Sequence, residues 1–336
     1  MTAMTNGPMP QQQIVVEQVT RPDQKNGLHH GMWARVLAEL AGSFMICFAI
    51  YMMLSFGTAF YGTDMAFVAL GTGVVYAAMT FIFSKISGGQ FNPAITVAAM
   101  LTNKTRVLDG ILYIVAQVIG AIAAGGLFAA VVPTSQSVQA TQWYSMIING
   151  YGEGSAMATQ LSQLGISFNI TLAIAVELIA SIIVVATAMA TLRSNGAPTR
   201  MHSIAMGVAY AAATTFSYVI TGASINPARA TGIAIFAHGK GLTKEPLTQL
   251  WVFWVCAILA AALVALAIII AQVINNSQNI AAQEAQIDDQ MQQDEQIMDP
   301  AAPVEGDVTL REQEADLAAP DGFAASMQDP QNSENK

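Results

Sequence analysis

The sequence has little charge, few cysteines and more acid than base. Only 10% of its 336 residues are charged, against roughly 25% in an average soluble protein. Its net charge of −9 would repel a phosphate backbone, which argues against a nucleic-acid-binding protein. Two cysteines, Cys47 and Cys256, are too few for a disulfide framework. Hydrophobic residues make up 54% of the chain, so much of it is expected where charge is costly.

The acidic balance belongs to the carboxyl end alone. Residues 275–336 hold 14 acidic and 2 basic side chains, which leaves 8 of the 22 acids and 11 of the 13 bases to the rest. This segment has one aromatic residue and cannot bury enough apolar surface to fold alone. It is predicted to be a disordered acidic tail, and residues 1–32 are predicted to be a second solvated tail. Residues 33–274 then form the membrane domain.

Six apolar stretches in this domain are long enough to cross a bilayer, which takes about 20 residues of helix. They are Trp33–Phe56, Met65–Ser84, Leu108–Val131, Ile170–Leu192, His202–Ile220 and Leu247–Ile274. The sequence therefore predicts an all-α, multi-pass membrane protein.

Basic residues lie mainly on one side of the predicted spans. The connections at 55–64 and 132–168 contain neither Lys nor Arg. Eight bases lie at the amino end or in the alternate connections, against Lys240 and Lys244 on the other side: Arg21, Lys25, Arg35, Lys85, Lys104, Arg106, Arg193 and Arg200. Because basic loops stay in the cytoplasm, both termini are predicted to be cytoplasmic.

Two shorter apolar segments, Ser87–Ala94 and Thr221–Ala228, are too short to span and resemble each other. They read SGGQFNPA and TGASINPA, and their Asn residues are 134 positions apart. Each follows the second span of a three-span half, so the halves at about 33–131 and 170–274 enter the membrane in opposite directions. Paired broken segments in inverted repeats indicate a pathway near the bilayer midplane.

The Asn-Pro-Ala triplets predict a short helix in each segment. Asn is a strong N-cap and Pro is favoured at the first helical position, so each triplet begins a half-helix. Inverted halves bring the two positive helix starts together at the pore centre. Both Asn side chains are expected to cap their helices and to donate to the permeant. The six residues assigned to this pore centre are Asn92, Pro93, Ala94, Asn226, Pro227 and Ala228.

Through these boxes, and through the following Arg229, the sequence resembles the aquaporin and aquaglyceroporin family of major intrinsic proteins. The resemblance covers about residues 33–274. It implies six tilted spans with two re-entrant half-helices, one pore per subunit and a homotetramer. It also implies that Arg229 lines the narrowest filter, donating to neutral solutes and repelling cations.

The family's three other filter positions fall here at Thr72, Thr214 and Ala223. Strict water channels place Phe and His at the first two positions, and glycerol facilitators place aromatics at the first and third. The small side chains of this chain therefore predict a comparatively wide filter. Other positions favour the water-channel type: Ala230, Ala234, Phe253 and Trp254.

Glu39 and Glu177 lie in the first and fourth spans, where an unpaired carboxylate would be expensive. A proton relay is one interpretation. The favoured one, as in the family, is that each carboxylate accepts hydrogen bonds from the loop that supports a half-helix.

The predicted function is a passive channel for water, with small neutral solutes as further permeants. The alternatives are a facilitator mainly for glycerol, urea, ammonia or a metalloid hydroxide, an ion-coupled transporter, and a structural membrane protein with a closed pore. No nucleotide-binding loop, nucleophile–base pair or metal-ligand spacing is visible. We therefore predict no enzyme activity, no cofactor, no metal and no nucleic-acid partner.

Overall fold

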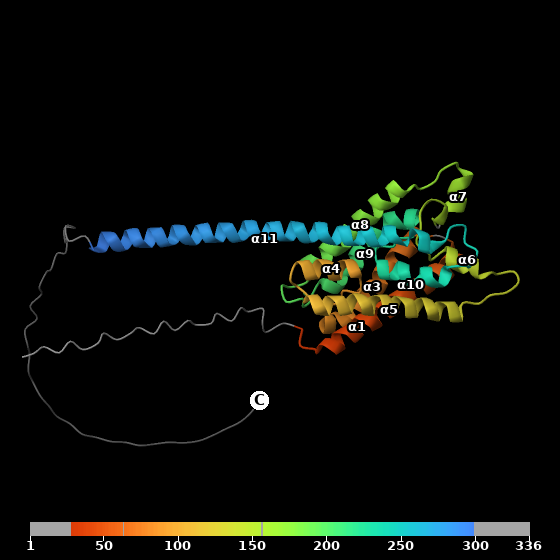
Figure 1. Ribbon diagram of the computed structural model, residues 1–336, viewed down its shortest axis with the longest axis horizontal. Coiled ribbons are helices and arrows are strands. Elements are labelled where there is room, and N and C mark those ends of the chain that lie inside the picture. The colour runs from red at the N-terminus through yellow and green to blue at the C-terminus, as the bar shows by residue number, and fades with distance from the viewer. Residues whose placement is uncertain (1–27, 63, 156, 299–336) are drawn as a thin grey trace, which may run out of the picture. The chain divides into compact units, whose positions relative to one another are not determined.

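A computed structural model describes residues 28–298 apart from residues 63 and 156. In these residues every named element is a helix, and Leu192 and Pro198 form an isolated β-bridge. Figure 1 shows the helices packed side by side around two shorter ones, α4 (Pro93–Leu101) and α10 (Pro227–Ala237). The predicted all-helical class is confirmed.

Six helices in the described residues are long and apolar enough to cross a membrane, as the hydropathy pattern predicted. Their bounds lie within a few residues of the predicted spans, except at the end of the last helix. They are α1 (Met32–Met52), α3 (Met65–Ser87), α5 (Val107–Val131), α8 (Ile170–Thr191), α9 (His202–Thr221) and α11 (Pro246–Met298). The span that contains α1 continues through a π-helical turn, Met53–Gly57, and is followed by α2 (Thr58–Tyr61).

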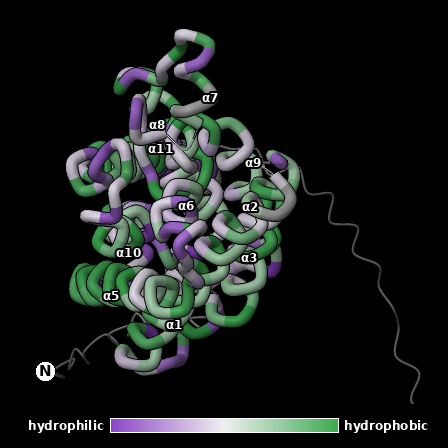
Figure 2. Tube along the Cα trace, turned by 90° about the vertical axis from the view of Figure 1, so that its right-hand side faces the viewer, coloured by the Kyte–Doolittle hydropathy of each residue, from purple (hydrophilic) through white to green (hydrophobic). Residues whose placement is uncertain are grey.

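The helices carry apolar side chains on their outer faces, which is the pattern of a protein solvated by lipid. On α5, Val107, Ile111, Val115 and Ile119 recur every four residues and are all about half exposed or more. Gln117 on the same helix is fully buried. Figure 2 shows hydrophobic residues along most of α5. One face of α5 therefore presents apolar side chains to the surroundings, and the polar Gln117 is turned toward the protein.

Glycines let the helices of the two halves approach closely. A Cβ at Gly73 of α3 would lie 2.5 Å from the carbonyl oxygen of Gly207 on α9. A Cβ at Gly207 would lie 2.7 Å from the Cβ of Ala77. This pair of Gly-x-x-x-Ala stretches is a small-residue interface of the kind that membrane helices use. It holds α3 against α9 at the middle of the membrane domain.

The connection at 132–168 is more ordered than a plain loop. It contains α6 (Ala140–Ser145), a 3₁₀ turn at Gly152–Gly154 and α7 (Ala158–Gln163). The indole of Trp143 stacks on Phe56 with ring centroids 4.6 Å apart. This part of the chain is thereby anchored to the end of the first span.

The first part of the carboxyl-terminal segment, residues 275–298, is helical, whereas the sequence predicted disorder. Helix α11 continues past the apolar span to Met298, and residues 299–336 lie outside the described residues. The stretch 275–298 contains neither Gly nor Pro and is rich in Gln, which favours helix, as do its Ala and Glu residues. Because the preceding span is already helical, this stretch extends a helix without the cost of nucleating one. The chain divides into two units within this helix, after Ser277.

Candidate functional site

Both half-helices begin at the Asn-Pro-Ala boxes in the manner that the capping argument predicts. Asn92 has extended backbone, and its side-chain oxygen accepts a hydrogen bond from the Ala94 N–H at 2.9 Å. The side-chain oxygen of Asn226 accepts from the Ala228 N–H at 3.0 Å and from the Arg229 N–H at 3.4 Å. All three partners are amides that helix geometry leaves without an internal acceptor.

The two boxes also bind each other across the repeat. The side-chain amide of Asn92 donates to the Ile225 carbonyl at 3.1 Å, and that of Asn226 donates to the Phe91 carbonyl at 2.7 Å. Phe91 and Ile225 both have left-handed backbone, with φ of 48° and 52°. This conformation costs an L-residue about 1–2 kcal/mol and is rare for a β-branched side chain. Other contacts must therefore hold these two residues in place.

Glu39 of α1 supplies those contacts for the first half. One carboxylate oxygen accepts from the Ser87 hydroxyl at 2.6 Å and from the Gln90 N–H at 3.0 Å. The other accepts from the Phe91 N–H at 2.6 Å and from the Gln117 side-chain amide at 2.8 Å. Because Glu39 is fully buried, these four hydrogen bonds take the place of water around its carboxylate.

Glu177 of α8 does the same for the second half. One of its oxygens accepts from the Thr221 hydroxyl and from the Ser224 N–H, the latter at 2.9 Å. The other accepts from the Ile225 N–H at 2.8 Å. Each carboxylate thus contacts the loop that leads into its own half-helix, including the residue with left-handed backbone.

Two tyrosines that no motif singled out take the remaining amide hydrogens of the paired asparagines. Asn92 donates to the Tyr210 hydroxyl at 2.9 Å, and Asn226 donates to the Tyr76 hydroxyl at 3.2 Å. A sequence signal for them exists. Tyr76 precedes Asn92 by 16 residues (92 − 76), and Tyr210 precedes Asn226 by the same 16 (226 − 210).

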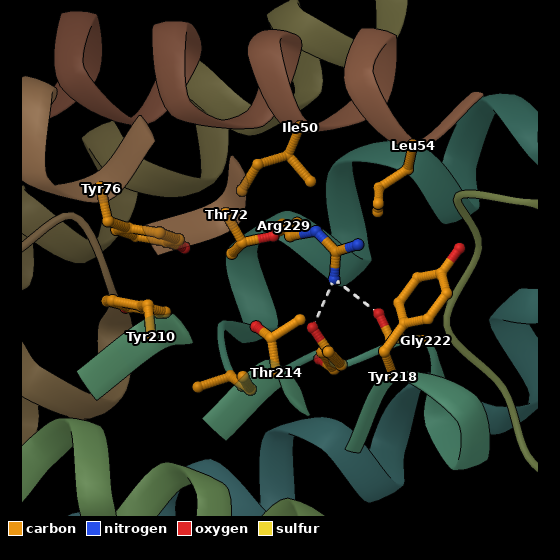
Figure 3. A pocket seen from close by; sticks show the side chains of 12 residues that line it. Ile50, Leu54, Thr72, Tyr76, Tyr210, Thr214, Tyr218, Gly222 and Arg229 are labelled. Carbon is orange, nitrogen blue, oxygen red and sulfur yellow. Dashed lines mark hydrogen bonds between the residues drawn. The ribbon is translucent and has the colours of Figure 1, made fainter. Parts of the chain in front are cut away.

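A small cavity lies beside this centre, and the four positions assigned to the filter all line it: Thr72, Thr214, Ala223 and Arg229. In Figure 3, Arg229 lies between the two threonines on one side and Leu54 and Tyr218 on the other. The volume within this cavity that the centre of a water molecule can occupy is only about 10 Å³. That volume is close to the minimum needed to hold one water molecule.

The wide filter stays a prediction, but the cavity that these four residues line is small. The side chains at the predicted positions are small, but Ile50, Leu54 and Tyr218 also line the cavity and fill the space. Leu54 lies in the π-helical turn that follows α1. The prediction considered only the four aligned positions, and these three residues come from other turns of the spans.

Arg229 is held by acceptors on one side only. Its Nη1 donates to the carbonyls of Ala223 at 2.7 Å and Gly222 at 3.2 Å, and to the side chain of Asn149 at 3.3 Å. Asn149 comes from the 132–168 connection, and no sequence pattern marked it. The Arg229 Nε and the Thr214 hydroxyl are buried without a partner in the structure.

Six spans, two half-helices that meet at their capped ends and a small cavity beside the junction define an inverted-repeat membrane channel. The sequence profile described as "Major intrinsic protein" matches residues 28–268. The chain belongs to the major intrinsic protein family. It is an integral, multi-pass membrane protein and a passive channel for water or small neutral solutes, so that transport rather than catalysis is its activity.

Relatives of this chain include two proteins named Aquaporin Z. The one from Photorhabdus laumondii is 32% identical over 230 residues, which are 68% of this chain and 93% of the relative. The one from Brucella melitensis is 32% identical over 232 residues, or 68% and 94% of the two chains. Among solved structures, the aquaglyceroporin from Plasmodium falciparum matches with a TM-score of 0.55 over 70% of this chain and 94% of that one. At 19% identity, that match shows the shared fold.

Proposed function

We propose that the chain conducts water passively and with preference over larger neutral solutes, along a path past Arg229 and the paired asparagines. The observation that carries this proposal is the cavity between them. It has room for about one water molecule, and the side chains of Arg229 and Thr214 line it. The similarity to two proteins named Aquaporin Z supports water as the main permeant.

Cation exclusion follows from the charges that surround the path. The Arg229 side chain is buried beside the cavity, and both half-helices direct their positive ends toward Asn92 and Asn226. A cation would lose its hydration shell there and be repelled by Arg229 and by the two helix starts. A neutral water molecule pays no such penalty, because it can exchange hydrogen bonds with the groups that it passes.

The proposal includes an orientation and an assembly. The distribution of basic residues supports two cytoplasmic termini, with the 132–168 connection on the opposite side. The family resemblance supports a homotetramer in which each subunit has its own pore. The roles assigned to Glu39 and Glu177 are structural: each carboxylate holds one half-helix loop in place.

Stopped-flow light scattering of proteoliposomes tests this function. Water efflux under an impermeant osmolyte should exceed that of empty liposomes, and re-swelling in urea or glycerol should be much slower. Protein-free liposomes and liposomes with a heat-inactivated sample are the controls. Glycerol passage as fast as water passage would instead favour the facilitator interpretation, and absence of any protein-dependent water flow would refute the channel function.

A further inference from the structure

The pore centre contains a pair of aromatic rings that the function proposed above does not explain. Tyr76 of α3 and Tyr210 of α9 lie face to face, with ring centroids 3.3 Å apart and planes inclined by 5°. Both side chains are buried. Figure 3 shows them together at one end of the cavity, with Leu54 and Tyr218 at the other end.

No water fits between these rings. Carbon atoms in contact are about 3.5–4.0 Å apart, so a separation of 3.3 Å between centroids of parallel rings is van der Waals contact. Because Tyr76 and Tyr210 also line the cavity, the stacked pair closes the end of the cavity that faces the paired asparagines.

The tyrosine hydroxyls also occupy the donors that water would use. A side-chain amide has two N–H hydrogens. In Asn92 one goes to the Ile225 carbonyl and one to the Tyr210 hydroxyl. Asn226 makes the equivalent pair of bonds, with the Tyr76 hydroxyl as one acceptor. With all four hydrogens bonded to protein, neither asparagine can donate to a passing molecule until a ring leaves.

We propose that Tyr76 and Tyr210 limit conduction in this channel: stacked, they close the pore at the asparagine pair, and water passes when the rings separate. This inference rests on the proposed function. The internal repeat supplies one ring from each half, at the same distance before each Asn. The close contact of Gly73 with Gly207, three residues before each tyrosine, brings the two rings within reach of each other.

The two stacked tyrosine rings can separate at a modest cost in free energy. Aromatic rings prefer offset or edge-to-face packing to a face-to-face sandwich, so the stacked arrangement is not a strong attraction. The two hydroxyl contacts are neutral hydrogen bonds, and a water molecule entering the site can replace each of them at a cost of about 0–2 kcal/mol. The rings can therefore separate without leaving a buried donor unpaired.

Water permeability of the Tyr76→Val/Tyr210→Val double variant tests the proposal in proteoliposomes of equal protein content. We expect a rise of about tenfold or more over wild type, since two bonds each worth a factor of about five hold the closed pair. We also expect a weaker temperature dependence of water flow, because ring separation no longer precedes it. Tyr151→Val, in the 132–168 connection, is the matched control and should behave as wild type.

A second double variant keeps the proposal testable if the valine variant does not fold. Tyr76→Phe/Tyr210→Phe keeps both rings and removes only the hydroxyl contacts, and it should raise water permeability by several-fold. Water flow no faster than wild type in either folded double variant would overturn the proposal. If wild type already conducts as fast as the valine variant, the channel function stands and the tyrosine pair does not limit it. If neither conducts water, the proposed function itself is refuted, and this inference with it.

Discussion

Replacing Glu39 by Gln changes one atom of the support beneath the first half-helix, and its effect can be worked out from the hydrogen bonds. Each carboxylate oxygen of Glu39 accepts two, from Ser87 and Gln90 on one side and from Phe91 and Gln117 on the other. Glutamine has one oxygen, so two of these donors would face an NH₂ group instead. The Ser87 hydroxyl and the Gln117 amide can turn to accept, but a backbone N–H cannot.

Whichever way the new amide is oriented, one backbone N–H, of Gln90 or of Phe91, therefore loses its acceptor. A buried donor without a partner costs about 1–3 kcal/mol. For domains of roughly 150–250 residues this corresponds to about 2–4 °C per kcal/mol, so the melting temperature should fall by about 2–12 °C. Because the Phe91 carbonyl accepts from Asn226, water permeability should fall as well.

Thermal unfolding of the purified protein in detergent, followed by tryptophan fluorescence, measures the first effect, and proteoliposome shrinkage measures the second. The matched control is Glu153→Gln. Glu153 is an exposed carboxylate in the 132–168 connection, and its replacement should leave both quantities unchanged. If Glu39→Gln melts and conducts like this control, Glu39 is not an ionised acceptor of four hydrogen bonds and the reasoning is wrong.

Three further predictions concern the cavity, the helix contact and the charges. Mercury should inhibit water flow through the Ala223→Cys variant strongly and through the wild-type protein little. Ala223 lines the cavity, whereas Cys47 and Cys256 are buried and do not line it. Mercury inhibition of a protein without cysteine would contradict this alignment. Gly73→Ala should destabilise the protein by about 1–3 kcal/mol in thermal unfolding, since its Cβ would meet backbone. Gly31→Ala, with nothing within 4 Å, is the control, and equal melting of the two variants would refute the close contact. A pH-sensitive dye inside the same liposomes would report proton flux under a pH gradient, and we expect no protein-dependent flux. A flux comparable to water conduction would show that the positive pore centre does not exclude protons.

Much of the candidate site could be predicted because its chemistry is local. A proline after an asparagine begins a helix wherever it stands, so Asn92 and Asn226 were identified as caps without knowledge of their surroundings. The repeat then placed both caps at one centre. The tyrosines at 76 and 210 share the same spacing to their asparagines, but an aromatic residue within a span is ordinarily lipid-facing or core, and only their contact distinguishes them.

The cavity width could not be predicted in this way. Small residues at positions 72, 214 and 223 indicate space only if nothing else enters it. Ile50, Leu54 and Tyr218 do enter it, from the first and fifth spans and from the turn that follows the first. Asn149, which binds Arg229, is separated from it by 80 residues of chain. Neither hydropathy nor a motif encodes which side chains of distant segments share a cavity.

Sequence alone determined the number of spans, the inverted repeat and the starts of the half-helices, because hydropathy and capping depend on neighbouring residues. It did not determine where helix α11 ends, since a helix already formed in the membrane extends cooperatively into a polar stretch. The sequence favoured loop donors for Glu39 and Glu177, but only the tertiary structure decided which donors bind them and that two tyrosines stack beside the asparagines. These contacts join atoms far apart in the chain, and the close packing of glycines on α3 and α9 brings the two tyrosines within reach of each other.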